Sequence, residues 1–153
     1  MRNILVTIII LISSTCFADD RMTPVFEKID DLVIRIDSGI SLNSFAESFA
    51  ELKIEYKKVK NNPEQINNPL LDDRMKFVIE TLDDYARVWK GQEVEGFKFV
   101  PQGAPLLSRH SVGHCRVDFR SGVAYGIPCV KVAILDELRP LLEKAKSAHY
   151  NGW

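Results

Sequence analysis

The chain has 153 residues, with 20 Lys or Arg residues against 21 Asp or Glu residues and a formal net charge of −1. This balance argues against a nucleic-acid partner, because proteins that bind nucleic acids need a concentrated basic face. The length suits a single domain with its own hydrophobic core.

The first 18 residues are predicted to be a secretory signal peptide. The positive residue Arg2 precedes an apolar run at 4–12, and the small residue Ala18 is suited to cleavage. This run is shorter than the about 20 apolar residues that a membrane-spanning helix needs. We therefore expect a periplasmic or secreted protein, with residues 19–153 as one helical domain and no transmembrane segment in the mature chain. An uncleaved anchor and lipidation at Cys16 are the alternatives.

Residues 23–60 predict two helices, because apolar residues recur there every three or four positions. Gly39 suits the end of the first helix, and either Ser41 or Asn43 suits the cap of the second. Since the connection is only a few residues long, the two helices are expected to pack as antiparallel neighbours.

The third predicted helix occupies residues 68–90 and forms the central wall of the structure. Asn68 suits its N-cap. Its apolar positions lie on one face, and they are Leu71, Met75, Val78, Leu82, Tyr85 and Trp89. The opposite face carries charged residues, among them Asp84, which we expect to be solvated.

A fourth helix is predicted to begin near Asp136, so that Pro140 lies in the first turn, where a missing N–H costs little. A longer helix that kinks at Pro140 is the alternative. Together the patterns predict a mainly α protein. It is a four-helix antiparallel bundle with a loop and β-hairpin inserted between the third and fourth helices, at about 91–130.

The two cysteines of the mature chain, Cys115 and Cys129, are predicted to form a disulfide, since an even pair in an exported protein is usually bonded. Apolar and polar residues alternate on both sides of a turn at 121–123. A three-residue turn would place Phe119 opposite Tyr125 and the two cysteines opposite each other. A two-residue turn would shift this register and misalign the sulfurs.

Two cofactor alternatives involve histidines. His110 and His114, with the two cysteines, offer the imidazole and thiolate ligands that zinc prefers, although a disulfide would remove both thiolates. Met22 and His149 stand near the positions from which exported helical bundles ligate haem iron. Met22 precedes the first helix, however, and the long insert departs from that pattern. The leading expectation is therefore that no cofactor is bound.

The leading functional hypothesis is an exported, non-catalytic binding or interaction protein whose partner is a protein or a small ligand. Long ordered loops often carry functional residues, and apolar and charged residues gather in this one outside any helical pattern. The candidate surface comprises Phe97, Phe99, Leu106, Leu107, Arg109 and His110. The alternatives are a small metal- or haem-binding carrier and an enzyme with an unrecognised site at 97–129. The oligomeric state stays open.

Overall fold

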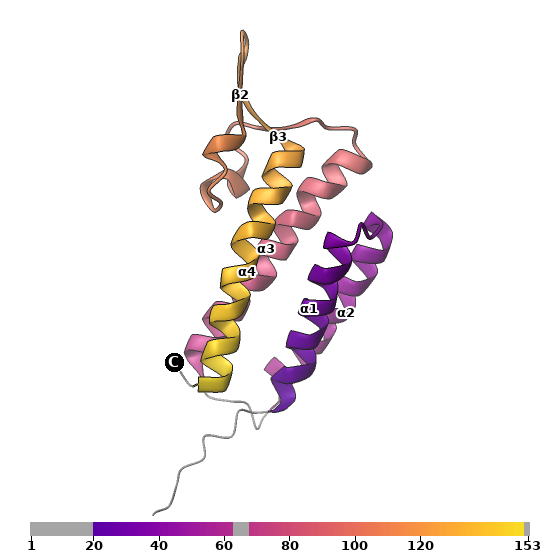
Figure 1. Cartoon of the computed structure of the whole chain (residues 1–153), viewed down its shortest axis with the longest axis vertical. Coiled ribbons are helices and arrows are strands. Elements are labelled where there is room, and N and C mark those ends of the chain that lie inside the picture. The colour runs from indigo at the N-terminus through magenta and orange to yellow at the C-terminus, as the bar shows by residue number, and fades with distance from the viewer. Residues whose placement is uncertain (1–19, 63–67, 152–153) are drawn as a thin grey trace, which may run out of the picture.

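The computed structural model describes residues 20–62 and 68–151, so the predicted signal peptide lies outside the described residues. Four helices form an antiparallel bundle in which α1 lies against α2 and α3 lies against α4 (Figure 1). Their bounds are α1 Thr23–Asp37, α2 Leu42–Lys60, α3 Pro69–Glu93 and α4 Ile127–Asn151. The predicted fold class is confirmed.

The helix ends follow the local chemistry of the sequence. Gly39 lies two positions after the last residue of α1 and has a φ of 88°, a conformation that favours glycine. The side chain of Ser41, and not Asn43, caps α2 by accepting a hydrogen bond of 3.2 Å from the backbone N–H of Ser44. Asn68 caps α3 as predicted, by accepting one of 3.1 Å from the N–H of Leu71. Side-chain caps thus fix where α2 and α3 begin.

The hydrophobic core runs between the helices. All six residues of the predicted apolar face of α3 are buried. Phe45 of α2 packs against two of them, with ring centroids 5.6 Å from Tyr85 and 5.4 Å from Trp89. Ion pairs join the helices at the surface, including Asp30 of α1 with Lys146 of α4 at 2.8 Å. The helices therefore provide a packed scaffold for the segment inserted between α3 and α4.

The insert, residues 94–126, contains a small antiparallel sheet that extends beyond one end of the bundle (Figure 1). Its strands are β1 Phe99–Pro101, β2 Arg116–Phe119 and β3 Gly122–Gly126, in the order β1-β3-β2. Short 3-10 turns at Pro105–Ser108 and Gly113–Cys115 shape the segment between β1 and β2. The insert therefore places two edge strands at the end of the bundle.

The predicted hairpin register was wrong, although the disulfide prediction is confirmed. The turn has two residues, so Phe119 pairs with Gly122 and Tyr125 pairs with Arg116. Cys115 and Cys129 are nevertheless bonded, with their Cα atoms 5.5 Å apart. The reason is that Cys129 lies in the first turn of α4 and not on a strand, so strand register does not decide where its sulfur lies.

The predicted start of α4 near Asp136 was also wrong. The helix begins at Ile127 and contains Pro140 in its interior. Burial explains the longer helix, because Ile127, Val130 and Ile134 extend its apolar face toward the N-terminus. Packing of this face against the core offsets the hydrogen bond that a proline removes from a helix interior.

Within the described residues, none of the helices combines the length and the apolar character needed to cross a membrane.

Candidate functional site

A cluster of charged side chains attaches the insert to the bundle. We call it the charged cluster, and it comprises Asp84 of α3, Arg109 and His110 of the insert, and Glu137 of α4. Arg109 donates from Nε and Nη2 to the two carboxylate oxygens of Asp84, at 2.8 and 2.6 Å. The His110 ring lies between two carboxylates, with Nδ1 2.7 Å from Glu137 and Nε2 3.1 Å from Asp84. The cluster therefore joins three separate segments.

Every member of the charged cluster has an opposite charge beside it. Both ring nitrogens of His110 face carboxylate oxygens, so only the protonated imidazolium donates to both. Glu137 also accepts a hydrogen bond of 2.6 Å from the backbone N–H of Ser111. Such charge-assisted hydrogen bonds compensate for the loss of water around buried groups.

Hydrogen bonding controls the ionisation of both carboxylates. Burial alone would raise the pKa of Asp84, but hydrogen bonds from Arg109 and His110 outweigh it and lower that pKa. Burial likewise opposes ionisation of Glu137, whereas hydrogen bonds from Ser111 and His110 lower its pKa below the usual range. Both groups are therefore held as carboxylates.

Asp84 corrects an expectation from the sequence, which assigned it to a solvated face of the helix. Its exposed fraction is only 2%, and Thr81 and Val88 on the same side of α3 are buried as well. The sequence did contain a signal for the burial of Asp84. Thr81 and Val88 are uncharged and lie near it on the helix, so they extend the buried face of α3 around it. Nothing in the sequence pointed to Arg109 or Glu137 as its companions in the cluster.

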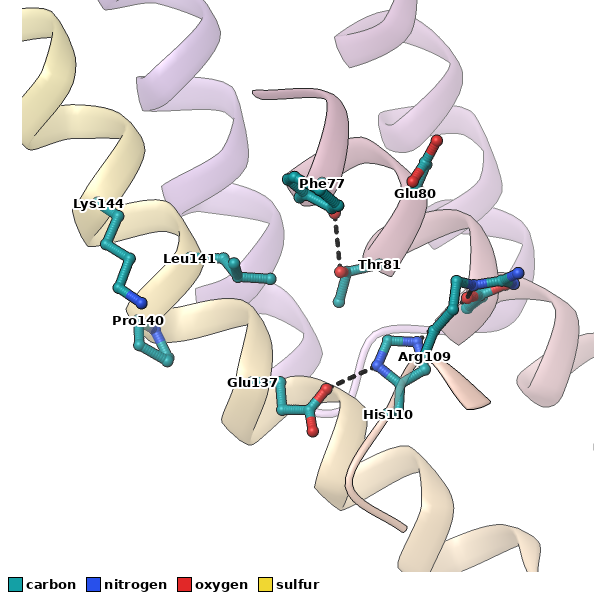
Figure 2. A pocket seen from close by; sticks show the side chains of 10 residues that line it. Phe77, Glu80, Thr81, Arg109, His110, Glu137, Pro140, Leu141 and Lys144 are labelled. Carbon is teal, nitrogen blue, oxygen red and sulfur yellow. Dashed lines mark hydrogen bonds and ion pairs between the residues drawn. The ribbon is translucent and has the colours of Figure 1, made fainter. Parts of the chain in front are cut away.

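A groove between α3 and α4 adjoins the charged cluster (Figure 2). We call it the α3–α4 groove; its volume is about 470 Å³. Besides the four residues of the cluster, its lining comprises Phe77, Glu80, Thr81, Pro140, Leu141 and Lys144. Arg109 and His110 lie at one end, and Lys144 extends from α4 on the other side of Glu137 (Figure 2). The groove thus has an apolar middle and charged surroundings.

The structure separates the two histidines of the predicted zinc site. His114 lies beside the disulfide, where one of its ring nitrogens and the two sulfurs are within 4.8 Å of one another. His110 belongs to the charged cluster instead. Because Cys115 and Cys129 are bonded to each other, neither offers a thiolate while the disulfide is intact.

The two residues of the haem alternative are buried. Met22 lies in a 3-10 turn, Asp20–Met22, directly before α1. His149 lies near the end of α4, with its ring centroid 5.3 Å from that of Phe26 and 4.7 Å from that of Tyr150. Both side chains therefore lie in the packed interior of the described structure.

Three exposed phenylalanines mark the surface of the insert. We call them the aromatic patch: Phe97, Phe99 and Phe119, with exposed fractions of 54%, 38% and 45%. The rings of Phe99 and Phe119 are in edge-to-face contact, with centroids 5.0 Å apart. Phe97 lies against the end of α3, where a Cβ atom added at Gly91 would be 3.4 Å from its ring. Phe119 was not among the residues predicted for this surface.

A small hollow lies beside the aromatic patch. Its volume is about 170 Å³, and its lining includes Phe97, Phe99, Pro101 and Leu106. Three residues of the predicted interaction surface therefore meet around one hollow. The other three lie elsewhere: Leu107 packs against the core, and Arg109 and His110 line the α3–α4 groove.

Comparison of this chain with protein-family models, curated proteins and solved structures finds no match.

Proposed function

We propose that this protein is an exported, non-catalytic interaction module that binds a partner protein through the aromatic patch and its hollow. The observation that carries the proposal is the exposure of Phe97, Phe99 and Phe119 on one small insert. Aromatic residues are enriched where proteins bind one another, because they contribute a large apolar area with few rotatable bonds.

The size of the hollow favours a protein partner over a small molecule. Pockets for small ligands are typically about 300–1,000 Å³, whereas this one is about 170 Å³. A space of this size suits a single apolar side chain. We therefore expect an aliphatic or aromatic anchor residue of the partner to fill the hollow beside Phe97 and Phe99.

The disulfide and the charged cluster both attach the insert to the bundle, and this favours tight binding of a partner. The disulfide joins Cys115, which directly precedes β2, to the first turn of α4, and the charged cluster holds the loop before it. A surface held in place before binding loses less conformational entropy when the partner docks.

The charged cluster favours a binding role over an enzymatic one. His110 is a buried histidine beside the α3–α4 groove, and both of its ring nitrogens are within hydrogen-bond distance of carboxylates. Proton transfer by His110 would require one of these bonds to break first.

Photo-crosslinking in the native host tests the proposal. A photoreactive residue at position 97 should yield an adduct with a defined partner protein. The matched control is position 34, because Ile34 is a similarly exposed apolar residue on α1, with an exposed fraction of 63%. The variant Phe119→Ser should reduce the adduct at position 97. Equal adducts at both positions, or none at position 97, would contradict the proposal.

A further inference from the structure

The α3–α4 groove has the features of a second binding site, separate from the aromatic patch. Positions 77, 81 and 84 of α3 share one helical face, as do positions 137, 141 and 144 of α4. Side chains from both faces line the groove, and the loop carrying Arg109 and His110 lies at one end (Figure 2). Two helices and the insert thus converge on one concave surface.

The middle of the groove offers apolar contacts. Phe77 is 56% exposed although it is a large aromatic residue, and Leu141 lies on the facing helix (Figure 2). The hydroxyl of Thr81 donates a hydrogen bond of 2.8 Å to the carbonyl oxygen of Phe77, so this donor is already used. Phe77 and Leu141 therefore offer apolar contacts to the body of a ligand in this part of the groove.

Two of the three acids that line the groove, Asp84 and Glu137, are held by close hydrogen bonds. Asp84 and Glu137 accept hydrogen bonds from Arg109, His110 and the backbone of Ser111. Glu80 lies 4.0 Å from Lys76 on the same helix. At Asp84 and Glu137 a cationic ligand would have to compete with these hydrogen bonds.

Lys144 is the lysine of the groove lining, and its amino group is not paired with any acid of the described residues. Within the described residues its amino group lies in none of the ion pairs, whereas Lys146, two positions further on, is 2.8 Å from Asp30. The backbone of Lys144 is held in place, because its carbonyl oxygen accepts a hydrogen bond from Arg74 of α3. A ligand carboxylate at Lys144 would complete an ion pair without displacing another.

We propose that the α3–α4 groove binds a small organic acid with an apolar body of about eight to twelve carbon atoms, a size in keeping with typical ligand pockets. The body lies between Phe77 and Leu141, and the carboxylate pairs with Lys144. The volume of about 470 Å³ falls within the usual range for small-ligand sites. The groove is partly open to solvent, which implies weak binding, with a Kd on the order of 1 mM.

Titration of the isotopically labelled mature protein with octanoate, followed by NMR, tests this inference. The expected result is saturable shifts of the backbone amides of residues 77–84 and 137–144. Octylamine, which has the same chain with the opposite charge, should not reproduce them. Saturable shifts confined to another part of the molecule, or equal binding of octylamine, would overturn the inference.

A matched pair of charge variants isolates the role of Lys144. Lys144→Glu should weaken octanoate binding at least tenfold, because it replaces the pairing cation with a repelling anion. Lys57→Glu makes the same charge change at an exposed position on α2 and should leave binding unchanged. Circular dichroism melting curves verify that both variants fold. Equal binding by the two variants would overturn the inference and leave the proposal for the aromatic patch unaffected.

Discussion

Nδ1 of His110 lies 2.7 Å from Oε2 of Glu137. This hydrogen bond joins the insert to a residue of α4 that is 27 positions further along the chain. The other oxygen of the same carboxylate accepts the backbone N–H of Ser111. One side chain of α4 thus holds two consecutive residues of the insert, which makes the position of the loop depend on Glu137.

Replacing Glu137 should therefore destabilise the protein. Glu137→Gln removes the carboxylate that accepts from the ring of His110 and from the backbone N–H of Ser111, and we expect the free energy of unfolding to fall by about 1–3 kcal/mol. Urea denaturation at pH 7 measures the change. The control is Glu143→Gln, whose carboxylate is exposed and 3.4 Å from Lys146; its effect should be below about 0.5 kcal/mol. Equal effects of the two substitutions would contradict a special role of Glu137.

The contribution of Asp84 should depend on pH. Its pKa is lowered in the folded protein, where hydrogen bonds from Arg109 and His110 outweigh burial. A carboxyl group with a lowered folded pKa contributes its full stability above the pKa of the unfolded state, about 4. That contribution is lost as the pH falls through the lower, folded pKa.

Comparison of the unmodified protein with Asp84→Asn measures this dependence. At pH 7 the variant should be less stable by about 2–4 kcal/mol, because Arg109 and His110 lose their buried counter-charge. The difference should narrow below about pH 4, where Asp84 of the unfolded chain begins to accept a proton, and should go on narrowing until the pH has fallen through the lower pKa of the folded protein. A difference that stays constant from pH 7 to pH 3 in urea denaturation would show that the charge of Asp84 is not the stabilising feature.

Much of the fold follows from local patterns that the sequence displays directly. The apolar face of α3, from Leu71 to Trp89, and the cap at Asn68 are encoded within a few residues, and both are confirmed. The hairpin register and the start of α4 were not predictable in this way. The register depends on the length of the turn, which has two residues and not three. The start of α4 depends on Ile127 and Cys129 joining a helix, and the burial of Ile127 favours this.

The charged cluster was less predictable than the fold. Asp84 and Arg109 are 25 positions apart, and no periodicity links a helix to a loop. The prediction of an interaction surface grouped six residues by their position in the sequence. The structure instead divides them between the hollow, the core and the groove, because neighbouring loop residues face different directions.

Removing the disulfide should loosen the insert more than the bundle. The double variant Cys115→Ser/Cys129→Ser opens a loop whose ends are 14 positions apart, and we expect a loss of about 3 kcal/mol on the chain-entropy model. Hydrogen exchange should accelerate most at residues 116–126, where the strands leave the bundle. Uniform acceleration over all four helices would instead mean that the disulfide supports the whole bundle and not specifically the insert.

The most direct test of the central claim is the yield of the crosslinked adduct at position 97 when the attachments of the insert are removed. The claim is that a partner protein recognises Phe97, Phe99 and Phe119 on a surface held in place before binding. We predict a clear adduct in the chain that retains the disulfide and a strongly reduced yield in the folded Cys115→Ser/Cys129→Ser variant. An undiminished yield in that variant would show that recognition does not depend on the disulfide-held arrangement.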